Sequence, residues 1–99
     1  MTKLLTIKQS NIDGLGLFAT EFIPSNTNLG MTHIFDDRFE DGVIRLPLGG
    51  FFNHSETPNT IIKEVYSEDL NINYLELITI NDINAGDEIT AIYTLYKPI

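Results

Sequence analysis

The chain has 99 residues and a mass of 11.2 kDa, which is the size of one small domain spanning residues 1–99. It contains no cysteine, and this excludes a disulfide scaffold, a cysteine-ligated zinc site and a cysteine nucleophile. Six Lys and Arg against 14 Asp and Glu give a net charge of -8, which argues against nucleic-acid binding and favours a basic partner.

The predicted elements are short strands, because Ile, Val, Thr, Tyr and Phe are frequent and Gly, Pro, Asn and Asp interrupt the chain often. In chain order, strands are expected at residues 4–8, 17–20, 29–35, 43–46, 60–66, 72–80 and 88–95. Turn residues separate these segments. No window keeps a helical period over three turns, so the pattern predicts a single, mainly β domain.

The segment 72–80 is the longest strand candidate, and it is apolar on both faces. Leu75 and Leu77 fall on one face. The other face carries Ile72, Tyr74, Ile78 and Ile80. A strand that is apolar on both faces is typical of a covered sheet, so we expect this segment to be central and buried on both sides.

Targeting and membrane segments are not expected. No run approaches the roughly 20 apolar residues that a membrane-spanning helix requires. Residues 1–8 are too few and too polar for a signal peptide. We therefore expect a soluble intracellular protein without a membrane partner.

Three short motifs carry the chemistry that the sequence offers. The first is Gly14-Leu15-Gly16. Two glycines around one residue let the backbone approach a ligand closely, although such a pair is more often only a turn. A phosphate-binding loop is excluded, because no long helix follows to supply an anion-binding N-terminus.

The second motif is a dense polar segment at residues 53–59, with the sequence Asn-His-Ser-Glu-Thr-Pro-Asn. Its polar groups can satisfy an irregular backbone or hold a polar ligand. His54 is a candidate metal ligand or general base, but a hydrogen-bonded structural histidine is the more common case. His33 is the only other histidine, so no metal site is expected.

The third motif, at residues 86–93, is a turn that leads into an alternating strand and ends at Tyr93. Taken alone, Tyr93 fits a core residue whose hydroxyl finds a partner. Taken together and in this order, the three motifs are far more specific than any one of them.

In that combination the chain resembles the SET domain of protein lysine methyltransferases. That family carries G-x-G near its start, then N-H-S-x-x-P-N, then G-E-E-L-T/I-x-x-Y near its end. The likeness extends from about Ile12 to Tyr96. The compact layout, without flanking cysteine-rich segments, looks like that of the minimal viral and bacterial members, among them a small viral histone methyltransferase that acts as a dimer. It implies one minimal SET domain over residues 1–99: a β-clip-like fold of short strands in small sheets, with a C-terminal pseudoknot.

The resemblance also implies a reaction, in which a methyl group passes from S-adenosyl-L-methionine to the neutral side-chain amine of lysine without a metal. Tyr93 is the implied catalytic residue, and Tyr96, or alternatively Tyr74, would line the lysine channel. The implied cofactor-binding residues are Gly14, Leu15, Gly16, Asn53 and His54. The implied substrate is a basic protein, such as a histone tail or another host protein, and a homodimer is expected.

Two alternatives stay open. Gly50, Glu56 and Ile92 stand where the family often has Arg, Cys and Asp, and the segment between the first two motifs is short. These departures are compatible with a catalytically weak or inactive SET-like module that binds the cofactor or a protein partner. The other alternative is a β-fold interaction module that binds no cofactor.

Overall fold

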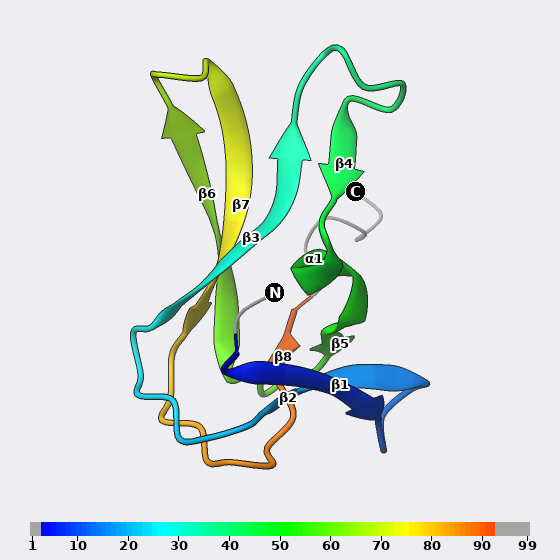
Figure 1. Cartoon of the computed structure of the whole chain (residues 1–99), viewed down its shortest axis with the longest axis vertical. Coiled ribbons are helices and arrows are strands. Elements are labelled where there is room, and N and C mark those ends of the chain that lie inside the picture. Colours follow the sequence, from blue (N-terminus) through cyan, green and yellow to red (C-terminus); the bar gives the residue numbers. More distant parts are fainter. Residues whose placement is uncertain (1–2, 93–99) are drawn as a thin grey trace.

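The computed structural model describes residues 3–92, which form a mainly β domain as the sequence predicts (Figure 1). The elements are β1 (Leu5–Gln9), β2 (Leu15–Ala19), β3 (Asn28–Phe35), β4 (Val43–Arg45), α1 (Pro47–Phe51), β5 (Asn53–His54), β6 (Thr60–Ser67), β7 (Ile72–Thr79) and β8 (Thr90–Ala91). Within this described part, no helix is long and apolar enough to span a membrane.

The strands form three small sheets. The largest is antiparallel with the order β4-β3-β7-β6, and it makes the upper part of the view in Figure 1. Strands β1 and β2 form an antiparallel pair, and β5 and β8 form a parallel pair. Both pairs lie below the large sheet, so the three sequence motifs gather at one end of the molecule (Figure 1).

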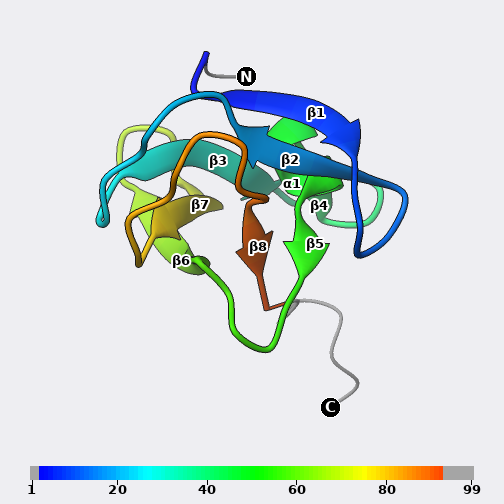
Figure 2. The same ribbon diagram turned by 90° about the horizontal axis from the view of Figure 1, so that it is seen from below.

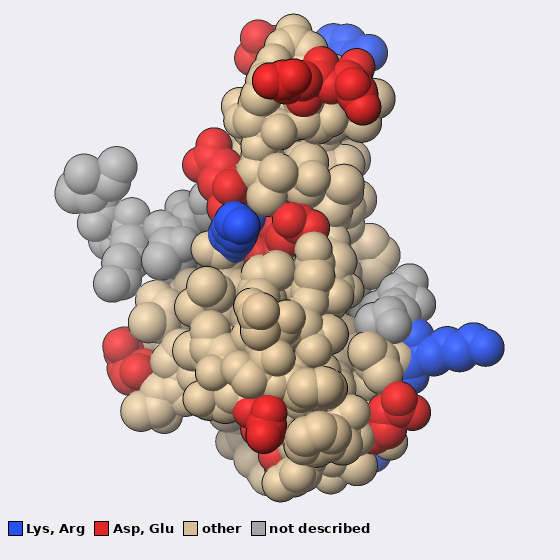
Figure 3. Space-filling model, turned by 90° about the vertical axis from the view of Figure 1, so that its left-hand side faces the viewer, with Lys and Arg blue, Asp and Glu red and all other residues tan. Residues whose placement is uncertain are grey.

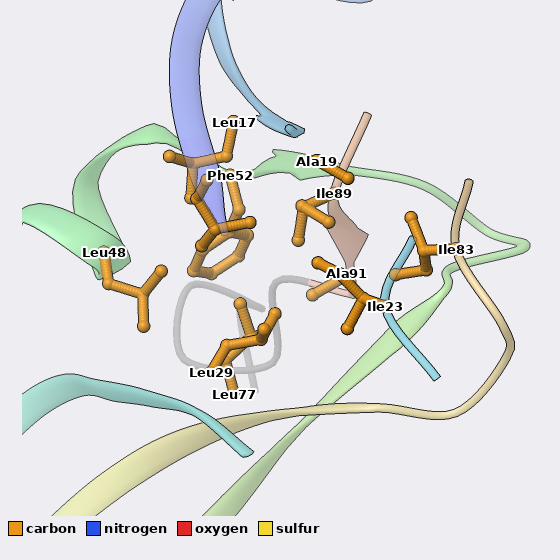
Figure 4. Packing of buried hydrophobic residues seen from close by; sticks show 11 residues of the cluster. Leu17, Ala19, Ile23, Leu29, Leu48, Phe52, Leu77, Ile83, Ile89 and Ala91 are labelled. Carbon is orange, nitrogen blue, oxygen red and sulfur yellow. The ribbon is translucent and has the colours of Figure 1, made fainter. Parts of the chain in front are cut away.

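The buried core lies where the three sheets meet, and the turn after β2 and the segment before β8 also contribute to it. In Figure 4, Leu17 and Ala19 from β2, Ile89 and Ala91 near the chain end, and Leu29 and Leu77 from the large sheet point toward one another. The complete cluster is Leu5, Leu17, Ala19, Ile23, Leu29, Leu48, Phe52, Leu77, Ile83, Ile89 and Ala91. This packing fixes β2 and β8 against the large sheet, and burial of each larger side chain contributes about 1.5–3 kcal/mol.

Two expectations about the elements are wrong. The sequence does not predict α1, a five-residue helix that begins at Pro47. Strand β7 is central, but it is not covered on both sides: Leu75 and Leu77 are buried, whereas Tyr74 is only half-buried. Ile80, which belonged to the expected strand but follows β7, is 40% exposed. Strand β8 ends at Ala91, and residues 93–95 of the expected last strand lie outside the described residues.

The segment 53–60 wraps around β8, and this is the predicted pseudoknot. On one flank of β8, Asn53 in β5 pairs with Thr90. On the other flank, Asn59 Nδ2 donates to the Glu88 carbonyl at 2.7 Å, and its Oδ1 accepts from the Thr90 N–H at 2.8 Å. In Figure 2 the connection that follows β5 runs around the end of β8 on its way to β6.

Candidate functional site

The side chain of Asn53 lies at the point where the three motifs meet. It is 93% buried, since its exposed fraction is 7%. Its Nδ2 lies 3.1 Å from the Asp13 carbonyl, 3.3 Å from the Leu15 carbonyl and 2.7 Å from Glu88 Oε2. One amide group from the second motif therefore contacts the backbone around the first motif, Gly14–Gly16, which we call the bend. The same amide group contacts a carboxylate of the third motif.

The glycines of this bend have different surroundings. Gly14 has a positive φ of 44°, which favours glycine, and a Cβ placed on it would point into open space. A Cβ on Gly16 would lie 2.4 Å from Glu88 Oε2 and 3.2 Å from Asn53 Nδ2. The absence of a side chain at Gly16 therefore leaves room for the Glu88 carboxylate to reach Asn53.

Two residues of this cluster, Ser10 and Glu88, were not identified as site residues from the sequence. Ser10 Oγ lies 2.7 Å from Glu88 Oε1 and 2.9 Å from Oε2. The same hydroxyl accepts a hydrogen bond from the Ile12 N–H at 2.9 Å. Glu88 belongs to the third motif, so the sequence could have indicated it as a site residue. No local pattern, however, links it to a serine 78 residues away.

His54 follows Asn53 directly, but its side chain has a different environment. Its backbone pairs with Ala91 in the β5–β8 ladder. Because successive side chains of a strand point to opposite faces, the imidazole points away from the Asn53 amide. Its Nε2 lies 3.0 Å from Glu56 Oε1. The structure therefore places Asn53 at the bend and places His54 on the other face of the same strand pair.

A small cavity of about 170 Å³ lies beside the last described residue, Ile92. Pro58, Thr60, Ile61 and Ile62 complete its lining, which is mostly apolar. Thr60 Oγ1 donates to the Thr90 carbonyl at 2.7 Å, so the cavity lies on the flank of β8 that faces away from β5. The bend with Asn53 and this cavity therefore lie on opposite flanks of β8.

Of the three tyrosines considered from the sequence, Tyr74 alone lies among the described residues. Tyr93 and Tyr96 lie outside the described residues. Tyr74 lies in β7, where it pairs with Ile34 of β3 and Val65 of β6 on the outer face of the large sheet. Among residues 3–92, no three His, Asp or Glu side chains are grouped in a way that could hold a metal ion.

In a comparison with known protein families, the SET domain model matches residues 30–94. This range includes the second and third motifs and lies after the first motif. It spans more than half of the chain. The comparison with curated proteins found no match.

Several solved structures share the fold. A candidate histone methyltransferase of Plasmodium falciparum has a TM-score of 0.74 at 22% identity, over 94% of this chain and 95% of its own. A humanized mutant of the Chaetomium thermophilum Polycomb Repressive Complex 2 has a TM-score of 0.74 at 20% identity, over 100% of this chain. A ctPRC2 structure bound to S-adenosylmethionine has a TM-score of 0.75 at 20% identity. This chain spans only 16% of each of these two Polycomb chains.

Proposed function

This chain belongs to the SET-domain family, and from that premise we propose that it is a protein lysine methyltransferase that uses S-adenosyl-L-methionine. One observation carries the proposal: Asn53 joins the Gly14–Gly16 bend to Glu88, and all three contacts fall within 3.3 Å. The P. falciparum structure, which is described as a candidate histone methyltransferase, supports the proposal through its shared fold.

The residues present fit the cofactor. S-adenosyl-L-methionine carries an ammonium, a carboxylate and an adenine, and it supplies a methyl group on a sulfonium that is already a good leaving group. Because the Asn53 nitrogen is engaged by three acceptors, its oxygen is left as an acceptor for an ammonium N–H. Leu15, 54% exposed, offers apolar surface beside it. We assign cofactor binding to Gly14, Leu15, Gly16, Asn53 and His54, with His54 contributing through its backbone because its imidazole points to the other face.

The cavity beside Ile92 is the proposed entry for the substrate lysine. Its apolar lining suits the aliphatic part of a lysine side chain, and desolvation favours the neutral amine that the reaction needs. Tyr93 follows Ile92 in the sequence, and we propose that its hydroxyl orients this amine. Tyr96 is the proposed channel wall. Cofactor and lysine then approach β8 from opposite flanks, and alignment supplies most of the rate enhancement.

The proposed substrate is a lysine-containing basic protein segment, such as a histone tail. The net charge of -8 attracts such segments and accelerates their encounter with the site. Much of this charge lies in the loops at the far end of the large sheet, where acidic side chains are visible at the top of Figure 3.

Methyl transfer from labelled cofactor to core histones, located by mass spectrometry, tests the proposal. We expect Tyr93→Phe to lower transfer about a hundredfold, because loss of amine alignment has that order of effect. Tyr66→Phe is the matched control, since Tyr66 donates to Asn71 Oδ1 at the tip of the β6–β7 hairpin. Cofactor binding without transfer to any basic protein would favour the inactive SET-like module instead.

We also propose that the protein is a homodimer. Apolar side chains lie on the outer face of the large sheet, where Met31 is 37% and Ile61 is 46% exposed. A small domain gains stability when a copy of itself covers such a face. Light scattering should give twice the 11.2 kDa mass of one chain, and Met31→Lys should shift the mass toward one chain. A wild-type mass of a single chain would contradict the dimer.

A further inference from the structure

The orientation of the Asn53 amide is fixed by the chemistry of its neighbours. Its three partners are two backbone carbonyls and a carboxylate oxygen, all of which only accept hydrogen bonds. The NH₂ group must therefore face them, and the amide oxygen must face away. The contact with Glu88 Oε2 is the shortest of the three, at 2.7 Å, and hydrogen bonds to a carboxylate are stronger than those to a carbonyl.

Ser10 holds the carboxylate in place from the other side. Its hydroxyl donates to Glu88 and accepts from the Ile12 N–H, so it links the carboxylate to the backbone of the bend. Both Ser10 and Glu88 are distant in sequence from Asn53, by 43 and 35 residues. The approach of Glu88 also depends on Gly16, where a Cβ would lie 2.4 Å from Oε2.

We propose that Ser10 and Glu88 are positioning residues, which hold the Asn53 amide so that its oxygen is presented to the α-ammonium of the cofactor. This inference rests on the proposed function. The proposal also explains why a glycine stands at position 16: the missing side chain leaves space for the Glu88 carboxylate as well as for the cofactor. Neither Ser10 nor Glu88 needs to touch the reacting atoms.

The test measures ligand affinity by calorimetry and does not depend on turnover. Two ligands are compared: S-adenosylhomocysteine and its analogue that lacks the α-amino group. We expect Glu88→Ala to weaken S-adenosylhomocysteine binding roughly tenfold or more, and Ser10→Ala to weaken it several-fold, because the amide loses its fixed orientation. Both variants should bind the deaminated analogue as the wild type does. Ser10→Thr keeps a hydroxyl and should restore most of the affinity.

Glu76→Gln is the matched control, because Glu76 also accepts a hydrogen bond from an asparagine, Asn28, but in the large sheet away from the bend. It should change neither affinity. Thermal melting of every variant checks folding, and Ser10→Ala serves if Glu88→Ala does not fold.

The outcomes separate the two proposals. Equal losses for both ligands would show a merely structural role and overturn the positioning proposal. Unchanged affinities in Ser10→Ala and Glu88→Ala would overturn it as well, while the proposed function stands. If the wild type binds neither ligand, the proposed function fails, and the positioning role fails with it.

Discussion

The buried imidazole of His33 in β3 links folding to pH. It is 2% exposed, and its Nδ1 lies 2.9 Å from Thr32 Oγ1. In the part of the chain that the structure describes, its Nε2 has no hydrogen-bond partner. Burial first, and then the positive charge of Arg45, lower the pKa of His33 below its ordinary value of 6.5. The folded chain therefore holds this imidazole neutral.

The free energy of unfolding should consequently depend on His33 below neutral pH. The unfolded chain takes up the proton more readily than the folded chain, so the contribution is complete above pH 6.5 and is lost as the pH falls below it. Urea unfolding between pH 5 and pH 8, a range set by about one and a half units around that ordinary value, measures this slope. We expect His33→Phe to reduce the slope and His54→Gln, which keeps His33, to retain it. An unchanged slope in His33→Phe would contradict the assignment.

At the scale of elements, local sequence decides the strands and tertiary contact decides α1. The strands at 29–35 and 60–66 were predicted to within one residue of β3 and β6, because alternating apolar residues and bounding turns mark them. The helix was not predicted, because Pro47, Gly49 and Gly50 are typical of a turn. Packing provides the missing information, since Leu48 is buried in the core.

The two glycines of α1 provide a matched pair of substitutions. A Cβ on Gly49 would lie 2.4 Å from the Thr32 carbonyl and 3.0 Å from His33 Cε1, whereas a Cβ on Gly50 would have its nearest neighbour at 3.8 Å. We expect Gly49→Ala to lower the free energy of unfolding by about 1–3 kcal/mol through overpacking. Gly50→Ala should be neutral or stabilise the helix by up to about 1 kcal/mol. Equal effects in chemical denaturation would show that α1 can move away from β3.

For the whole molecule, the family resemblance predicted which distant segments meet, but it did not predict what holds them together. The resemblance implied a C-terminal pseudoknot, and residues 53–54 pair with the last described strand. The contact of Ser10 with Glu88 was not foreseen, because a side-chain hydrogen bond between such distant residues depends on the completed fold. The roles of Tyr93 and Tyr96, and a viral or bacterial origin, stay predictions.

A substitution of Asn59 tests how the segment 53–60 is held against β8. Its amide makes one hydrogen bond to the Glu88 carbonyl and one from the Thr90 N–H, and both partners lie next to or in β8. We expect Asn59→Ala to lower the free energy of unfolding by about 1–3 kcal/mol, because two partly buried backbone groups lose their partners. Asn84→Ala, in an exposed turn, is the control. A difference below 0.5 kcal/mol, roughly the size of ordinary surface effects, would argue against this role.

The path of β8 has a consequence for biosynthesis. The ribosome releases the chain from its N-terminus, and a domain generally folds as a unit. The loop of residues 53–60, which passes around β8, leaves the ribosome well before residues 88–91. This later segment also supplies the Glu88 carboxylate that contacts Asn53. Under the proposed function, a nascent chain that has released the loop but not this later segment cannot yet bind the methyl donor. Binding of the ligand to a nascent chain would therefore report that residues 88–91 have taken their place beside the loop of residues 53–60.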